Sequence, residues 1–172
     1  MPTSLQSLFY EGVRVAGIMG AGDVICQTWV DKRKINNIDV GRTLRFASVG
    51  LFYVGPALKI WYGTLDKIVN KADPPFKRGL KKMALDQFAF APGFVASLIG
   101  IFGLMNGDST KTVQKRLKKD YLDILIKNYM LWPPAQMINF SLVPIQYQVF
   151  FAQVVAVIWN TYLSMALNDD KK

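Results

Sequence analysis

The chain has 172 residues, of which 51% are hydrophobic and 19% charged, and its formal net charge is +9. The length fits one domain, and the charged fraction lies below the roughly 25% typical of soluble domains. The chain contains no histidine, so the usual general base and the commonest metal ligand are missing, which excludes a Ser-His or Cys-His hydrolase and argues against a zinc site. A single cysteine, Cys26, excludes an internal disulfide. We therefore expect no catalytic residues, no metal and no cofactor.

Apolar runs separated by short basic connectors organise the chain. About 20 predominantly apolar residues are needed to cross the hydrocarbon core of a membrane as a helix. Runs that meet this length, alone or with their flanks, lie at residues 12–30, 44–62, 85–105 and 145–167. The predicted fold is an all-α integral membrane bundle of about four kinked transmembrane helices, formed as a single domain over residues 1–172. Because the basic residues lie between apolar runs, anionic lipid headgroups are the expected partner and nucleic acid is not.

The first run carries small residues and two polar ones. Ala16–Gly20 and Gly17–Ala21 are pairs of small residues four apart, a spacing that lets helix backbones approach closely in lipid. Asp23 and Gln27 are one turn apart and share a helix face. Asp23 is either a residue at the helix end near the interface or a polar group inside the membrane.

Two cations, Arg45 and Lys59, lie near the ends of the second run. Long basic side chains at such positions can extend to the headgroups. The alternatives are pairing with Asp23 or Asp86 and a position facing a pore. All three interpretations stay open at this level.

Glycine and proline mark irregular points in the second and third runs. Gly55-Pro56 and Pro92-Gly93 each predict a kink or local break of the helix. In the third run Ala89, Gly93 and Ser97 step four residues apart, which predicts another closely packed face. Asp86 and Gln87 open this run and are candidate polar groups at its start.

Residues 109–122 are predicted to form an amphipathic helix. Val113, Leu117 and Tyr121 share one face, and lysines cover the other. This pattern is typical of a helix lying at a membrane surface. A solvated helix packed on a soluble neighbour is the alternative.

Residues 128–164 contain no Lys, Arg, Asp or Glu but hold several amide side chains. In the final run Gln153 and Asn160 are seven residues apart, on the same side as Ala152 and Ala156. A polar stripe along a membrane helix either bonds to other helices, at about 0.6 kcal/mol per bond, or lines a pore. By spacing alone, bonding between helices is slightly favoured over lining a pore.

The charge-free stretch also carries a long motif. Its members are Trp132, Pro133, Gln136, Asn139, Phe140, Pro144, Trp159 and Asn160. This pattern resembles the W-P-x-x-Q-x-x-N-F-x-x-V-P…W-N-x-Y-L-S signature of the Mpv-seventeen and twenty-two-kilodalton peroxisomal membrane protein family. The upstream Gly-Pro and Leu-Asp-Gln segments are most similar to the family's mitochondrial inner-membrane member.

The resemblance implies a four-span protein acting as a weakly selective channel and, in mitochondria, supporting mitochondrial DNA maintenance and nucleotide homeostasis. It places the chain in the mitochondrial inner membrane, with the peroxisomal membrane as the alternative. Two departures are visible in the sequence. Gln148 stands where the family often has a basic residue, and Cys26 has no second cysteine for a thiol pair.

The leading functional hypothesis is a pore for small polar solutes or metabolites. Its candidate lining or interhelical residues are Asp23, Gln27, Asp86, Gln87, Gln136, Asn139, Gln153 and Asn160. The rival is a non-conducting membrane scaffold or assembly factor, in which the same amides hold helices together. A homo-oligomer is compatible with both. The connectors at residues 31–45 and 106–127 together carry slightly more basic residues than the connector at residues 66–86 and the C-terminal tail. This favours the matrix side for the first two.

Overall fold

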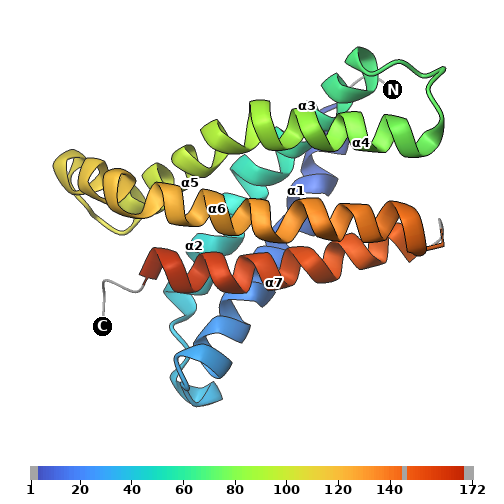
Figure 1. The fold of residues 1–172 in the computed structure, drawn as a ribbon. Helices are drawn as coiled ribbons and strands as arrows, with labels where there is room; N and C mark the ends of the chain where they lie inside the picture. The colour runs from blue at the N-terminus through green and yellow to red at the C-terminus, as the bar shows by residue number, and fades with distance from the viewer. Residues whose placement is uncertain (1–3, 145–146, 169–172) are drawn as a thin grey trace. The chain divides into compact units, whose positions relative to one another are not determined.

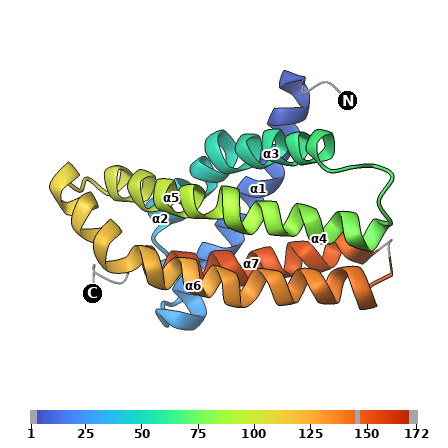
Figure 2. The same ribbon diagram turned by 45° about the horizontal axis from the view of Figure 1, so that its top comes forward.

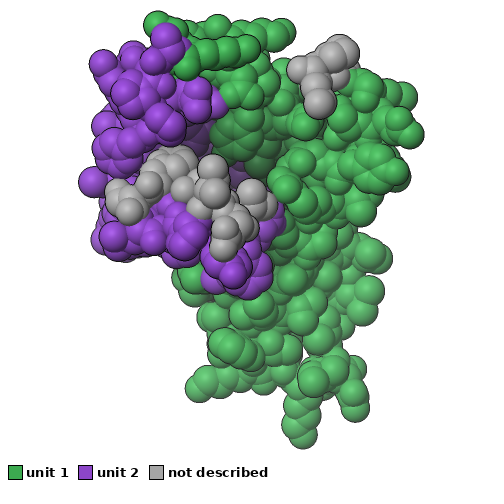
Figure 3. Space-filling model, turned by 90° about the vertical axis from the view of Figure 1, so that its right-hand side faces the viewer, with its two compact units in different colours: residues 1–71, 156–165 green, residues 72–155, 166–172 purple. Residues whose placement is uncertain are grey.

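The computed structural model describes residues 4–144 and 147–168, and within these residues every regular element is a helix. This confirms the all-α prediction. The chain divides into two compact units, shown in Figure 3. Unit 1 is Met1–Lys71 with Ala156–Met165, and unit 2 is Ala72–Val155 with Ala166–Lys172.

Unit 1 consists of one long helix, one interrupted helix and a segment of the last helix. The long helix is α1 (Leu5–Ile25), which continues into the π-helical segment η1 (Cys26–Val30). A short 3-10 turn, η2 (Ile35–Asn37), leads to α2 (Val40–Val49), η3 (Gly50–Val54) and α3 (Gly55–Ile68). Ser4 caps α1 by accepting a hydrogen bond from the Ser7 N–H, and Asp39 caps α2 in the same way from Arg42.

Unit 2 contains a second interrupted helix and the longest helix of the chain. These are α4 (Pro75–Leu85), η4 (Asp86–Phe90), α5 (Ala91–Met105) and α6 (Thr110–Leu142). The last helix is α7 (Gln148–Asn168). Its residues 148–155 and 166–168 belong to this unit, and the residues between them belong to unit 1. The turn between α5 and α6 contains Gly107 at φ +84°, a conformation that favours glycine. Arg116 pairs with Asp108 at 2.9 Å and donates to the Leu167 carbonyl at 3.3 Å.

The two interrupted helices widen directly before a proline. The Gly55 N–H donates to the Gly50 carbonyl and the Ala91 N–H to the Asp86 carbonyl, which are steps of five residues. Pro56 and Pro92 follow at the next position, and a proline has no N–H to continue the α-helical pattern. A π turn is one way for a helix to absorb this loss. The predicted irregularities at Gly55-Pro56 and Pro92-Gly93 are therefore present as π segments.

Glycine sets the contact between α1 and the interrupted helix of unit 1. A Cβ atom added to Gly50 would lie 2.8 Å from the Cα of Ala16, and one added to Gly55 would lie 2.5 Å from the Cα of Gly12. The backbones are thus in direct contact at both points. Of the predicted pairs, Ala16–Gly20 lies on this side of α1, whereas Gly17 has nothing within 4 Å of an added Cβ.

The predicted close-packed face of the third run is not present at its central glycine. An added Cβ on Gly93 would meet nothing within 4 Å. The spacing of small residues gives a smooth helix surface, but another backbone must also be directed at that surface before contact occurs. By contrast, Gly22 of α1 does lie against another helix, α7. A Cβ atom added to Gly22 would be 2.6 Å from the Cβ of Asn160.

Two helices of the described residues are long and apolar enough to cross a membrane. They are Pro75–Met105, with 31 residues, and Phe150–Asn168, with 19 residues. They overlap the predicted runs 85–105 and 145–167, of which residues 145–146 lie outside the described part of the chain. The predicted runs 12–30 and 44–62 fall on α1–η1 and α2–η3–α3.

The helix predicted over residues 109–122 is only the beginning of α6. Figure 1 and Figure 2 both show α6 as one helix, and it extends over 33 residues to Leu142. Pro133 and Pro134 lie inside it without ending it. The helix stops at Val143, which is extended at φ −88° and ψ 123° because the residue before Pro144 avoids the helical conformation.

Candidate functional site

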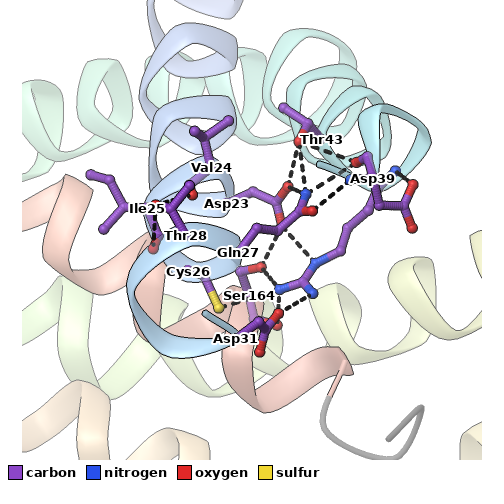
Figure 4. Close-up of polar contacts among 11 residues, drawn as sticks. Asp23, Val24, Ile25, Cys26, Gln27, Thr28, Asp31, Asp39, Thr43 and Ser164 are labelled. Carbon is purple, nitrogen blue, oxygen red and sulfur yellow. Dashed lines mark hydrogen bonds and ion pairs between the residues drawn. The ribbon is translucent and has the colours of Figure 1, made fainter. Parts of the chain in front are cut away.

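The carboxylate of Asp23 is the centre of a buried polar cluster in unit 1 (Figure 4). It accepts hydrogen bonds from four side chains that come from η1, α2 and α7. The donors are Gln27 Nε2 at 2.8 Å, Arg42 Nε at 2.7 Å, Thr43 Oγ1 at 2.6 Å and Ser164 Oγ at 2.5 Å. A buried carboxylate is stable only when its oxygens are satisfied in this way.

Arg42 supplies the positive charge of this cluster. Its Nη1 donates to Asp31 at 2.8 Å, and its Nη2 donates to Ser164 Oγ at 2.7 Å and to Cys26 Sγ at 3.2 Å. The guanidinium thus lies between two buried carboxylates, Asp23 and Asp31. Its planar arrangement of donors is suited to this task. We refer to Asp23, Gln27, Asp31, Arg42, Thr43 and Ser164 as the Asp23 cluster.

Gln27 positions the start of α2 against η1. Its Oε1 accepts from the Asp39 backbone N–H at 2.7 Å, and its Nε2 donates to the Asp39 carbonyl at 3.0 Å. The Asp39 side chain in turn accepts from the Arg42 backbone N–H at 2.9 Å. The start of α2, and with it the direction of the Arg42 side chain, is therefore fixed by an amide on the preceding helix.

The structure joins Asp23 and Gln27 as their spacing predicted, but their cation is Arg42. In the part of the chain that the structure describes, no ion pair involves Arg45 or Lys59, the two cations suggested as partners. Arg42 was not among the candidate residues predicted from the sequence. The available signal was its spacing: Arg42, Phe46 and Val49 share one helix face, and all three are buried.

A second buried pair lies in unit 2. Asn128 Nδ2 donates to Gln87 Oε1 at 2.7 Å, and the Tyr129 hydroxyl donates to the Gln87 carbonyl at 2.9 Å. Gln87 also donates to Asp86 at 3.0 Å. The η4 segment that carries Asp86 and Gln87 is therefore attached to α6 by side-chain hydrogen bonds. Asn128 was not among the predicted site residues, although it is the first residue of the charge-free stretch.

Asn160 is satisfied within its own helix. Its Nδ2 donates to the Ala156 carbonyl at 2.7 Å, and its Cβ forms the surface against which Gly22 packs. Trp159, the neighbouring motif residue, is buried and lies 5.5 Å from the Tyr162 ring, centroid to centroid. This part of the motif contributes to packing inside unit 1.

Three of the predicted amides differ from the hydrogen-bonded residues described above, because their side chains have no hydrogen-bond partner among the described residues. Gln136, Asn139 and Gln153 lie on either side of the turn between α6 and α7 in unit 2, and among the described residues no hydrogen bond to their side chains is found. Asn139 is only 4% exposed, and its Oδ1 is buried without a partner among the described residues. Gln136 and Gln153 are half-buried. Trp132 and Pro133 of the motif are half-buried on α6, Pro144 is exposed, and the Phe140 side chain lies outside the described part of the chain.

No group of three or more Cys, Asp or Glu side chains suited to a metal ion is found among the described residues. The Asp23 cluster and the Gln87–Asn128 pair are instead hydrogen-bonded within their helical units, and two of the described helices have membrane-spanning length. The fold and the site together define an all-helical protein with buried polar clusters and two helices long and apolar enough to cross a membrane.

Comparison with known proteins identifies the family. Residues 103–164 match the model of the Mpv17 / PMP22 family. The mitochondrial inner membrane protein Mpv17 of Drosophila melanogaster is 46% identical over 164 residues, covering 95% of this chain and 98% of that protein. The Homo sapiens protein of the same name is 44% identical over 150 residues, covering 86% and 82%. Protein SYM1 of Gibberella zeae is 38% identical over 159 residues, covering 92% and 89%.

The chain therefore belongs to the Mpv17 / PMP22 family of membrane proteins. Its close relatives are named as mitochondrial inner membrane proteins, and the mitochondrial inner membrane is its location. No solved structure matches the chain.

Proposed function

We propose that the chain forms a pore for small polar solutes in the mitochondrial inner membrane, and that Gln136, Asn139 and Gln153 contribute to the wall of the pore. The observation that carries this proposal is the buried Asn139 Oδ1, which has no partner among the described residues. The two half-buried glutamines on either side of the same turn support it.

The argument rests on what an amide requires inside a membrane. A buried polar atom without a hydrogen bond costs about 1–3 kcal/mol, and lipid offers no replacement partner. The buried Asn139 Oδ1 and the two half-buried glutamines, in a stretch without charged residues, are accounted for if water reaches them. A water-filled path lined by uncharged amides would pass small polar solutes with little selectivity. This agrees with the weakly selective channel that the family resemblance implies, and with a role in nucleotide supply for mitochondrial DNA.

The other candidate residues have a different role in this proposal. Asp23, Gln27 and Gln87 have their polar atoms engaged by protein groups, so they brace their units rather than face water. We also propose that α1–η1 and α2–η3–α3 cross the membrane together with the two helices of spanning length. The chain then crosses the membrane four times.

Conductance of the purified protein in planar bilayers tests the pore. Gln153→Leu and Asn139→Leu keep the side-chain volume but remove the amide, so we expect a lower conductance or a changed cut-off for sized polar solutes. Gln114→Leu is the matched control, because Gln114 is an exposed glutamine on the first half of α6, and it should leave the conductance unchanged. A folded wild-type protein that conducts no solute would contradict the proposal.

A non-conducting scaffold is the second candidate, and the closed Asp23 cluster favours it. The four side chains that donate to Asp23 all belong to the protein's own helices, as expected if buried polar groups serve only to hold helices together. In a scaffold, Gln153→Leu and Asn139→Leu would keep or raise the stability and leave every membrane function intact. The same two variants therefore separate the candidates.

A further inference from the structure

Pro92 leaves one backbone carbonyl of η4 without a donor in its own helix. The Ala91 N–H donates to the Asp86 carbonyl. Pro92 follows and has no N–H, so the next carbonyl along, that of Gln87, receives no donor from the helix. The helix Pro75–Met105 is long and apolar enough to cross a membrane, and Pro92 lies near its middle. In a membrane no water replaces a missing donor, so a neighbouring helix must supply it.

Tyr129 of α6 supplies that donor. Its hydroxyl donates to the Gln87 carbonyl at 2.9 Å, and the amide of the preceding residue, Asn128, donates to the Gln87 Oε1 at 2.7 Å. Gln87 and Asn128 are both buried. Two adjacent residues of α6 thus hold the backbone and the side chain of the residue at the bend. We call these two hydrogen bonds the Gln87 latch.

The corresponding carbonyl of unit 1 is covered in a different way. Leu51 has the same place before Pro56 that Gln87 has before Pro92. Its oxygen lies against the backbone of Gly12, where an added Cβ atom would collide with it. A backbone contact of this kind separates only when two helices move apart, whereas a hydroxyl releases its acceptor by a small rotation. The bend of unit 2 is therefore the one that is held by a releasable bond.

The segment that is free to move about this bend is α4. On the other side of Pro92, the short turn between α5 and α6 ties these two helices together. They also pack closely there, since a Cβ added to Gly103 would lie 2.9 Å from Val113 Cγ2. In contrast, α4 has α6 as a neighbour, but no residue of α4 is buried. A segment with so little buried surface is the first to open locally.

An amide on the same face of α6 opposes the latched arrangement. Asn139 follows Asn128 by eleven residues, or three helical turns, so the two side chains share a face. The Asn139 Oδ1 is buried without a partner among the described residues, and access to water would remove this cost. An unsatisfied amide and one hydrogen bond from a hydroxyl are effects of similar size. The latched and released arrangements are therefore close in free energy.

We propose that the Gln87 latch holds a gate of the pore closed. When Tyr129 and Asn128 release Gln87, α4 swings away from α6 about the bend at Pro92, and water reaches Asn139. In the structure the latch is formed and Asn139 is only 4% exposed, so this arrangement is the closed one. The gate rests on the proposed pore, whereas the latch and its movement are measurable without conduction.

Tyr129→Phe removes the hydroxyl and keeps the ring. In planar bilayers it should raise the ratio of open to closed time about tenfold, the effect of one hydrogen bond on an equilibrium, and leave the solute cut-off unchanged. Tyr121→Phe is the matched control, because Tyr121 is a half-buried tyrosine of the same helix without a hydrogen bond among the described residues. It should behave as the wild type. An unchanged or lower open time in Tyr129→Phe would overturn the gate.

Pro92→Ala tests whether the hydroxyl replaces the missing N–H of the proline. With alanine there, the Gln87 carbonyl gains a donor within its helix in either geometry. The N–H of residue 92 donates to it if the π turn persists, and the Ala91 N–H donates if the helix becomes α-helical. In the Pro92→Ala background, Tyr129→Phe should therefore change neither the open time nor the melting temperature. Equal effects of Tyr129→Phe in both backgrounds would overturn the latch.

Spin labels measure the movement independently of conduction. Leu80 of α4 and Met137 of α6 are exposed, and the native Cys26 is fully buried, so labels attach to Leu80→Cys and Met137→Cys. Adding Tyr129→Phe should populate a longer distance between the two labels, and adding Pro92→Ala as well should remove it. Such a shift in a protein that does not conduct would support the latch and contradict the pore. An unchanged distance would overturn the latch even in a protein that conducts.

Discussion

At the scale of single residues, the charge balance of the Asp23 cluster has direct consequences. One guanidinium, that of Arg42, serves two buried carboxylates. Removing one partner of a buried ion pair leaves an uncompensated charge, and this costs more than the pair itself contributes. Removing Arg42 should therefore destabilise the protein more than removing the charge of one of its two carboxylate partners.

We expect Arg42→Gln to destabilise the protein by about 3–5 kcal/mol, because it removes the cation that pairs with Asp23 and with Asp31. Asp23→Asn should cost less, about 1–3 kcal/mol, because Arg42 keeps Asp31. Unfolding by SDS in mixed micelles measures both free energies. Arg45→Gln is the control on the same helix and should change the stability little. If Asp23→Asn costs more than Arg42→Gln, the charge balance described here is wrong.

A pH effect is expected at Asp73, in the loop before α4. Its carboxylate accepts a hydrogen bond from Lys81 Nζ at 2.6 Å, and Lys77 lies at 3.7 Å. The hydrogen bond from Lys81 and the nearby lysine charges hold the pKa of Asp73 below its ordinary value near 3.8. A carboxylate whose pKa is lowered by folding stabilises the folded state at pH values above its ordinary pKa. This stabilisation is lost as the pH falls through the lowered pKa.

The stability difference between the wild type and Asp73→Asn should therefore be present at neutral pH and disappear in acid. Melting curves of both proteins between pH 2 and pH 7 measure it. The effect should be small, because Lys77 and Lys81 are exposed and solvent screens the pairs. A difference that grows toward acid would contradict the assignment.

At the scale of the elements, unit 1 depends on backbone contact between α1 and the π segment η3. The atoms nearest to an added Cβ on Gly50 are the Cα and N of Ala16, at 2.8 and 2.9 Å. Backbone atoms cannot rotate away as a side chain can. The π segment η3 begins at Gly50, so the part of the helix that widens before Pro56 starts at its contact with Ala16 of α1.

Gly50→Ala is expected to destabilise the protein by about 1–3 kcal/mol through overpacking. Gly63→Ala is the matched control in α3, where an added Cβ meets nothing within 4 Å, and it should stabilise the helix by up to about 1 kcal/mol. Unfolding free energies in the same micelles measure both. Equal effects of the two substitutions would show that α1 and η3 are not in contact in the folded protein.

At the scale of the whole molecule, two hydrogen-bond networks are built separately. The Asp23 cluster belongs to unit 1, and the Gln87–Asn128 pair belongs to unit 2. The two networks share no residue among the contacts described above. Their contributions to stability should therefore be independent.

We expect the free-energy changes of Asp23→Asn and Asn128→Leu to add within about 0.5 kcal/mol in the double variant. SDS unfolding of the two single variants and the double variant completes the cycle. A larger departure from additivity would mean that the networks are coupled through elements that both units use.

The sequence by itself determined the helical class, the apolar runs, the irregular points before Pro56 and Pro92, and the family motif. These properties depend on local composition and on spacing within one helix, which the chain carries directly. The pairing of Asp23 with Gln27 belongs here too, because the two are one turn apart.

Only the tertiary structure decided which polar residues satisfy one another. Ser164 reaches Asp23 across 141 positions and Asn128 reaches Gln87 across 41, and no periodicity encodes such distances. Spacing predicted a closely packed face at Gly93, where an added Cβ meets nothing within 4 Å, whereas the backbone of another helix lies against Gly50, a residue that the spacing did not single out. Helix periodicity fixes which residues share a face, whereas the partner of that face depends on how the helices pack. For this reason Asp23 was a candidate from the sequence, and Arg42 became its partner only in the fold.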